Sequence, residues 1–115
     1  MENDCIFCKI VAAEIPADRL VHNDYVTAFR DINPAAPTHI LIIPNKHVAS
    51  VNELTEADEI LVGKMFTTAR ALAKEEGIDE SGYRLILNTG PDGRQVVFHL
   101  HMHLIGGQRM KHPMG

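Results

Sequence analysis

The sequence predicts an α+β domain, in which a five-stranded antiparallel sheet carries one long helix and one short helix. One long segment, residues 54–76, repeats its apolar residues with the period of a helix. Five short apolar or alternating segments surround it, most of them bounded by Pro, Gly, Asn or Asp. The 115 residues, 45% of them hydrophobic, are enough for one core, so residues 1–115 are expected to form a single domain.

The first predicted element is a short helix over Cys5–Ala13. Asp4 is positioned to cap its N-terminus, and Pro16 follows closely enough to stop it. The apolar side of this helix consists of Ile6, Phe7, Ile10 and Val11.

Three strands are predicted before the long helix. Leu20–His22 and Val26–Arg30 are expected to form a hairpin because an Asn-Asp pair between them favours a turn. A proline-bounded connection over residues 31–38 leads to an apolar strand over His39–Ile43, which Pro44 ends.

The long helix is expected over Leu54–Glu76. Thr55, with Asp58 three residues later, is typical of a capping box, and Gly77 supplies the left-handed residue after the helix. Its apolar positions form a face wider than packing on one sheet requires, so either a second copy of the chain covers the extra width or the helix lies deep in its own core. The two stripes of this face are Leu61, Met65, Thr68, Leu72 and Val62, Phe66, Ala69, Ala73.

Two strands are predicted after the long helix. Tyr83–Asn88 forms the fourth, and the glycine-rich loop Thr89–Arg94 leads to the fifth over His99–Ile105. The last segment, residues 106–115, is expected to be irregular and to lie over the surface.

Three histidines alternate with apolar residues in the predicted fifth strand. This period of two places His99, His101 and His103 on one face of the sheet. At about 3.3 Å per residue, the backbones of His99 and His103 are roughly 13 Å apart, so two of the rings can share a metal ion but all three cannot. A row of imidazoles suits nucleophilic or proton-transfer chemistry near neutral pH. The alternative is a solvent-facing strand that contains histidines by chance.

The two cysteines, Cys5 and Cys8, have the C-x-x-C spacing of one half of a zinc site. A tetrahedral site needs two more ligands, and His47 and His99 are the candidates. A thioredoxin-like redox pair is less favoured because that motif follows a strand in a βαβ unit. Two thiols without a metal, beside a surface His47, are the remaining alternative.

Composition and charge exclude several classes of protein. The net charge of −4 and the lack of a Lys/Arg cluster argue against a nucleic-acid-binding or membrane-surface protein. The sequence has no apolar run of transmembrane length, and its first residues have neither the basic start nor the apolar core of a signal peptide, so we expect a cytoplasmic protein.

Polar residues next to the histidine strand suggest a pocket for an anionic ligand. The exposed N–H groups of Gly90–Arg94, together with the Arg94 side chain, form a plausible anion cradle, although such a loop also suits an ordinary hairpin. Asp31 fits either a turn or the recognition of two ribose hydroxyls, and Asn88 fits either a pocket or a turn.

Three segments together resemble a known family. The run His-Leu-His-Met-His-Leu-Ile, residues 99–105, resembles the defining motif of the histidine triad proteins. Residues 31–44 and 82–88 are similar to the nucleotide-binding branch of that family. The resemblance implies a homodimer whose two sheets join into one, with a pocket for a purine nucleoside monophosphate in each protomer.

The resemblance also implies an activity and a role for each matching residue. The implied reaction is hydrolysis of purine nucleoside phosphoramidates, in which His101 attacks phosphorus and forms an adenylyl-histidine intermediate. His99, His103 and His39 complete the catalytic set, Asp31 binds the ribose hydroxyls, and catalysis needs no cofactor. The purine is walled by Ile6, Phe7, Ile10, Phe29 and Ile32, and the phosphate is faced by Asn88, Gln95, Val96 and Val97.

Two other functions stay open for such a sequence. One is hydrolysis of dinucleoside polyphosphates, which uses a similar triad. The other is nucleotide binding by a regulatory or scaffold protein in which turnover is incidental. The chain departs from the family pattern at Val96, where many members have a phosphate-contacting Ser. It departs again at His112, where some relatives have a Trp in a tail that reaches the partner's active site.

Overall fold

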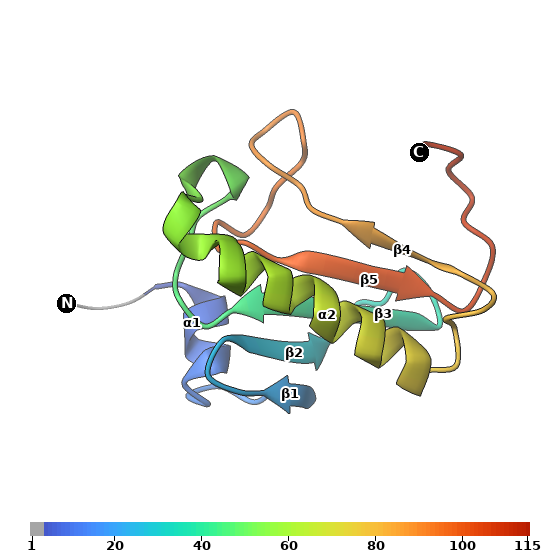
Figure 1. Ribbon diagram of the computed structural model, residues 1–115, viewed down its shortest axis with the longest axis horizontal. Coiled ribbons are helices and arrows are strands. Elements are labelled where there is room, and N and C mark those ends of the chain that lie inside the picture. The colour runs from blue at the N-terminus through green and yellow to red at the C-terminus, as the bar shows by residue number, and fades with distance from the viewer. Residues whose placement is uncertain (1–3) are drawn as a thin grey trace.

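The computed structural model describes residues 4–115 and contains one five-stranded antiparallel sheet (Figure 1). The strands lie in the order β1-β2-β3-β5-β4, so that β4 forms one edge of the sheet. The predicted fold class, with five antiparallel strands, one long helix and one short helix, is confirmed. The strands are β1 Arg19–His22, β2 Val26–Arg30, β3 Thr38–Pro44, β4 Tyr83–Ile86 and β5 Met102–Gly106.

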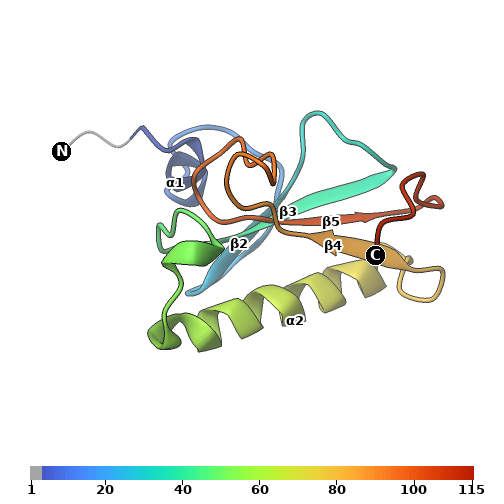
Figure 2. The ribbon, with the colours of Figure 1, turned by 90° about the horizontal axis from the view of Figure 1, so that it is seen from above.

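The two helices lie on opposite faces of the sheet, as Figure 2 shows. The long helix, α2 (Glu59–Glu75), packs against β2, β3 and β5 and closes the larger core. The short helix, α1 (Ile6–Val11), packs on the other face, where Phe7 and Ile10 join Phe29 in a second apolar cluster. The histidines of residues 99–103 lie toward this second face because the apolar residues between them are buried in the α2 core.

The cap of α1 differs from the prediction. Cys5 is the N-cap, and its Sγ accepts a hydrogen bond from the backbone N–H of Cys8, so Asp4 does not cap the helix. The helix also ends at Val11, before the predicted end at Ala13. The exit is sharp because Ala13 adopts a positive φ of 60°.

The helix α2 is shorter at its start than predicted. Residues 56–58 form a 3₁₀ turn, η2, and a further 3₁₀ turn, η1 (Val51–Glu53), precedes it. The predicted capping box between Thr55 and Asp58 is present on η2, and Gly77 has the expected left-handed φ of 72°. Each apolar stripe of α2 contributes buried residues, but Phe66 of the second stripe is 46% exposed.

Both strands that flank the glycine-rich loop are shorter than predicted. β4 ends at Ile86, since the side chain of Asn88 bonds to the loop at the backbone oxygen of Gly93 instead. β5 begins at Met102, because the amide of Leu100 donates to the carbonyl of Val48 and leaves the sheet ladder. Between residues 4 and 115, no helix combines the length and apolar character needed to cross a membrane.

Candidate active site and metal centre

The three histidines of residues 99–103 divide between two adjacent clusters. His99 is fully buried and faces the cysteines of α1, whereas His101 and His103 line a cavity. The ring centroids of His101 and His103 are 5.0 Å apart. Phe7 contacts both clusters edge-on, with its centroid 5.9 Å from that of His99 and 5.2 Å from that of His101. The apolar ring therefore separates two neighbouring polar sites.

The orientation of His101 is fixed by its own backbone. Its Nδ1 lies 2.8 Å from the carbonyl oxygen of His99, two residues earlier. Because a carbonyl only accepts, Nδ1 must carry the proton, and the neutral ring has its lone pair on Nε2. His101 is 8% exposed and lines the cavity. This tautomer is the one that a histidine nucleophile requires.

His103 belongs to a hydrogen-bonded chain with His39 and Asp31. The amide of Ala35 donates to Nδ1 of His39 at 3.0 Å, so in the neutral ring Nε2 carries the proton. That Nε2 lies 2.9 Å from Nδ1 of His103 and 3.5 Å from Oδ2 of Asp31. His103 is left with a proton on Nε2, so the chain can pass protons between the strands β3 and β5.

Burial controls the charge of this chain. Burial, together with the neighbouring rings of His101 and His39, lowers the pKa of His103 to about 4. Burial also lowers the pKa of His39, against the opposing effect of the Asp31 carboxylate. Both rings are therefore neutral near pH 7, and a bound anion would favour their protonated forms.

These groups open into a cavity of about 780 Å³ on the α1 face. Asp31 and Asn88 lie in its wall, and Asp31 also makes a turn because its Oδ1 accepts the amide of Asn33. A cavity of this volume is large enough to hold a nucleotide. The lining residues are Phe7, Asp31, Ala35, Leu41, Asn88, Arg94, Val96, Val97, His101, His103 and His112.

The other predicted substrate-binding residues lie outside this lining. Ile10 and Phe29 pack behind Phe7, while Ile6 and Ile32 are 49% and 91% exposed. Gln95 is buried, and its amide bonds to the backbone of Gly90, Ala49 and Val97. The side chain of Gln95 therefore holds the loop rather than lining the cavity.

Sequence reasoning gave no site role to two residues in the wall. Leu41 lies on β3 two positions from His39, so strand alternation placed it on the correct face. The backbone amide of Ala35 holds the ring of His39, and because no side chain of Ala35 takes part, the sequence gives no sign of this contact.

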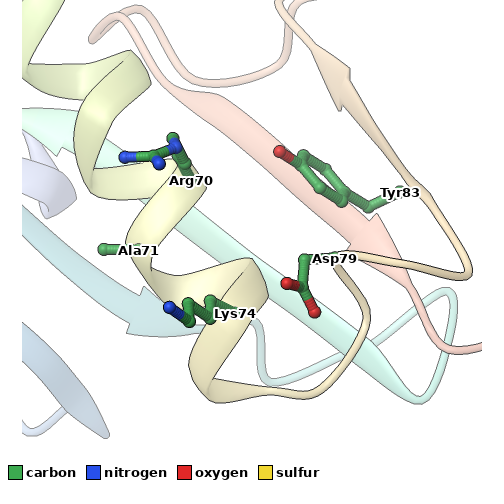
Figure 3. A pocket seen from close by; sticks show the side chains of 5 residues that line it. All are labelled: Arg70, Ala71, Lys74, Asp79 and Tyr83. Carbon is green, nitrogen blue, oxygen red and sulfur yellow. The ribbon is translucent and has the colours of Figure 1, made fainter.

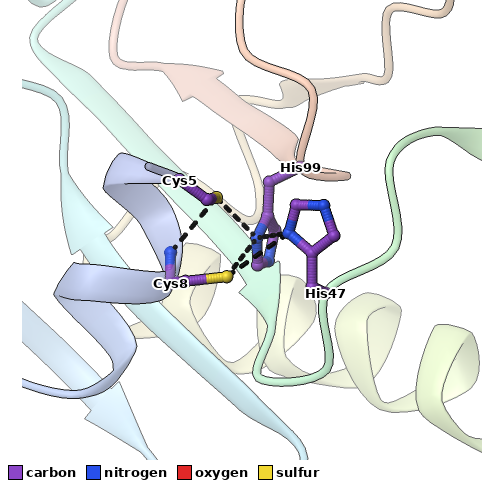
Figure 4. Close-up of side chains that lie close together, drawn as sticks. All are labelled: Cys5, Cys8, His47 and His99. Carbon is purple, nitrogen blue, oxygen red and sulfur yellow. Dashed lines mark hydrogen bonds between the residues drawn. The ribbon is translucent and has the colours of Figure 1, made fainter. Parts of the chain in front are cut away.

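The second cluster consists of Cys5, Cys8, His47 and His99 (Figure 4), the four residues predicted to bind zinc. Nδ1 of His99 lies 3.3 Å from Sγ of Cys5, 3.5 Å from Sγ of Cys8 and 3.2 Å from Nδ1 of His47. Nδ1 of His47 lies 3.3 Å from Sγ of Cys8. All four ligand atoms lie within 4.8 Å of one another.

These distances fit a tetrahedral zinc site. With Zn–N bonds of about 2.0–2.1 Å and Zn–S bonds of about 2.3 Å, the edges of the tetrahedron are roughly 3.3–3.8 Å. Nε2 of His99 donates to the carbonyl of Pro44 at 2.8 Å, which leaves the lone pair on Nδ1, facing the other ligands. Two thiolates and two imidazoles are a donor set that zinc prefers.

A separate cavity of about 430 Å³ lies between α2 and β4, on the opposite face of the sheet (Figure 3). Its wall contains no histidine or cysteine. Arg70, Ala71 and Lys74 line the helix side, and Asp79 and Tyr83 line the other. This hollow borders the sheet edge and takes no part in the histidine sites.

Fold and site together define a small α+β domain with a tautomer-fixed histidine in a nucleotide-sized cavity. A model of the HIT domain family matches residues 12–110, and the chain belongs to this family. The family resemblance expected from residues 99–105 is thereby confirmed, as is the class of histidine triad hydrolase.

Named relatives match over almost the whole chain. A purine nucleoside phosphoramidase of Escherichia coli is 53% identical over 108 residues, which cover 94% of this chain and 91% of the relative. The crystal structure of a HIT family hydrolase from Legionella pneumophila matches with a TM-score of 0.94 and 46% identity, covering 97% of this chain and 100% of the other. A zinc-bound histidine triad protein from Mycobacterium smegmatis matches with a TM-score of 0.80 and 27% identity, covering 94% and 78%.

Proposed function

We propose that this protein hydrolyses purine nucleoside phosphoramidates, breaking the P–N bond between a nucleoside monophosphate and an amine. The observation that carries the proposal is the 2.8 Å hydrogen bond from Nδ1 of His101 to the carbonyl of His99. It leaves the lone pair on Nε2 and aligns a neutral nucleophile. The phosphoramidase from Escherichia coli, at 53% identity, supports this choice of substrate.

The reaction proceeds in two displacements at phosphorus. Nε2 of His101 attacks the phosphorus atom, a new P–N bond forms, and the amine leaves with the electron pair of the bond that breaks. Water then attacks the adenylyl-histidine intermediate, and the bond to Nε2 breaks to release the nucleoside monophosphate. Two displacements replace one difficult step by two easier ones.

The leaving amine needs a proton, and His103 is the donor in this proposal. Its low pKa in the free protein means that substrate binding must supply the driving force. The anionic phosphoryl group favours a proton on the His39–His103 pair, and the carboxylate of Asp31 stabilises the same charge. In the second displacement, the pair regains a proton from the attacking water.

The cavity seats the nucleotide by the chemistry of its wall. The apolar cluster behind Phe7 supports the purine, and the exposed side chains of Ile6 and Ile32 offer further apolar contacts to it. The carboxylate of Asp31 accepts hydrogen bonds from the ribose hydroxyls. Val96 offers no hydroxyl, so the backbone N–H groups near Val97 bind the phosphoryl oxygens, and the amide of Asn88 adds polarity beside them.

Single-turnover reaction with an adenosine phosphoramidate, quenched early and analysed by intact mass, tests this function. We expect an adenylyl adduct on the wild-type protein and none on His101→Ala. AMP release without an adduct would contradict the intermediate. AMP binding without any turnover of either a phosphoramidate or a dinucleoside polyphosphate would favour a regulatory binding protein.

The four residues of the metal cluster would hold a structural zinc ion. The zinc would tie α1 to residues 47–48 and to His99, and it would supply no step of the reaction. Elemental analysis is expected to give about one zinc per chain. A metal-free protein of unchanged stability would contradict the site.

We place the protein in the cytoplasm. The reducing conditions there keep the thiols of Cys5 and Cys8 able to bind zinc.

A homodimer through β4 would complete the fold. β4 is one of the two edge strands, and the exposed face of α2 carries Phe66. Pairing two β4 strands would join the sheets and cover this face. Phe66→Glu is expected to shift the mass measured by light scattering from dimer to monomer. Tyr25→Glu, which changes a similarly exposed aromatic residue in the β1–β2 turn, should leave the mass unchanged.

A further inference from the structure

Arg94 has a backbone conformation that ordinary side chains avoid. Its φ is 62°, and within residues 4–115 Ala13, at 60°, is the other non-glycine residue with a positive φ. Such a conformation is strained and persists when the surroundings enforce it. Glycine would adopt it freely, yet the chain has arginine here.

The loop around Arg94 enforces this conformation. The amide of Arg94 donates to the carbonyl of Pro91 at 3.0 Å, and Asn88 donates to the carbonyl of Gly93 at 2.7 Å. The buried amide of Gln95 makes three further bonds to backbone. The loop is therefore rigid around one strained residue, an arrangement typical of functional sites.

The side chain of Arg94 lines the histidine cavity and is available for a ligand. In the described part of the chain, no ion pair and no hydrogen bond holds its guanidinium. Among residues 4–115, the only carboxylate in the wall is that of Asp31, and burial keeps His103 neutral. Of these described residues of the wall, Arg94 is thus the one whose positive charge is permanent.

We propose that Arg94 is a substrate-binding residue that selects for negative charge by placing its guanidinium on an anionic oxygen of the substrate. This inference rests on the proposed phosphoramidate hydrolysis. The oxygen belongs either to the phosphoryl group or to a carboxylate on the leaving amine, since a guanidinium binds both with the same two-pronged geometry. The backbone strain at residue 94 is the cost of holding this charge at the cavity.

The test compares variants that separate charge from strain. Arg94→Gln removes the charge and keeps the strain, Arg94→Lys keeps the charge, and Arg94→Gly removes both. Ala13→Gly is the matched control, because it relieves the same strain away from the cavity without altering charge.

Three adenosine phosphoramidates are the probes: one with a neutral leaving amine, one with a carboxylate on the amine and one with an added cationic group. For Arg94→Gln, kcat/KM is expected to fall by roughly 10–100-fold on the favoured substrate, with partial rescue by Arg94→Lys. An equal loss on all three compounds assigns the phosphoryl oxygens. A loss confined to the carboxylate compound assigns the leaving group.

The stability of the glycine variants distinguishes substrate binding from a structural role. We expect Arg94→Gly to raise the melting temperature by roughly 2–4 °C while lowering kcat/KM. Ala13→Gly should raise the melting temperature alone. Arg94→Gln with kcat/KM within about twofold of wild type on all three compounds would overturn the proposal.

Failure of the proposed function is a separate outcome. If the wild-type protein hydrolyses none of the three compounds, the phosphoramidase proposal fails. Calorimetric titration of the same compounds then decides the role of Arg94. A roughly 10-fold weaker Kd in Arg94→Gln for at least one of them supports the inference, and unchanged affinity for all three overturns it.

Discussion

Residues 99–103 place histidines in two different environments, which we call the metal end, at His99, and the catalytic end, at His101 and His103. At one end His99 is fully buried, and its Nε2 is tied to the carbonyl of Pro44, so Nδ1 faces two cysteines and His47. At the other end Nδ1 of His101 is tied to a carbonyl, so Nε2 faces the cavity. In each ring, the nitrogen that a backbone carbonyl holds determines that the other nitrogen faces the cysteines or the cavity.

The two ends are also joined by one bond. The carbonyl that fixes the tautomer of His101 belongs to His99, whose ring lies in the metal cluster. A metal that holds the ring of His99 would also hold this carbonyl in place. In that case the metal end would support the catalytic end through the backbone without contacting the substrate.

The largest expected effect is a loss of turnover at the catalytic end that leaves the metal end unchanged. His101→Asn keeps a polar side chain of similar reach but removes the nucleophile, so kcat should fall by about 10³-fold or more. The Kd for AMP, measured by calorimetry, should stay within about threefold, and zinc content should not change. His22→Gln, which alters an exposed histidine on β1, is the control. Equal loss of binding and turnover would contradict a nucleophilic role.

The second effect acts on the metal end alone. Cys5→Ser retains an N-cap side chain for α1, because Ser accepts the same hydrogen bond, but removes a soft metal ligand. We expect zinc affinity to fall by at least about 10–100-fold and the melting temperature to fall with it. Turnover should fall less, by roughly 10-fold, as the support of His99 loosens. Competition with a chelator measures the affinity, and unchanged zinc content would exclude Cys5 as a ligand.

The third effect acts on the boundary between the ends. Phe7 is 6% exposed and contacts Phe29 as well as both histidines. Phe7→Ala should lower the free energy of unfolding by about 3–4 kcal/mol, measured with urea, and impair both zinc binding and turnover. Phe7→Leu keeps most of the volume and should cost about 1–1.5 kcal/mol. If Phe7→Ala impairs only one of the two readouts, the ring does not serve as a shared wall.

Much of this arrangement could be predicted because it depends on local periodicity. Alternation placed the histidines on one face, and C-x-x-C spacing with His47 and His99 identified the four residues of the metal cluster. The capping box at Thr55 and the glycine at residue 77 likewise depend on residues a few positions apart.

The missed features depend on particular hydrogen bonds rather than on periodicity. Cys5 rather than Asp4 caps α1, because its Sγ accepts the amide of Cys8, and the same thiol lies beside His99. β4 ends early because Asn88 bonds to Gly93, and β5 begins late because Leu100 bonds to Val48. The first two bonds are local but involve side chains with several possible partners, and the third joins segments far apart in the sequence, so local patterns did not reveal them.

The smallest effect is the dependence of stability on pH, to which the buried histidines of both ends contribute. Burial lowers the pKa of His103 to about 4, whereas an unfolded histidine titrates near 6.5. Between these values the unfolded chain binds more protons than the folded one, so this stability is complete above about pH 6.5 and is lost as the pH falls toward 4. Buried His39 and His99, whose pKa values are also lowered, act in the same direction.

Thermal melts between pH 7.5 and 5 should show the melting temperature falling by roughly 5 °C. This window lies above the titration of Asp58 and Glu76, whose pKa values are held low by Lys46 and Arg30, so the carboxylates contribute little to the slope. His103→Gln should remove the share of His103 and leave a shallower slope that belongs to His39 and His99. An unchanged slope in His103→Gln would mean that His103 is already charged in the folded protein, and then the anion of the substrate would not be needed to protonate it.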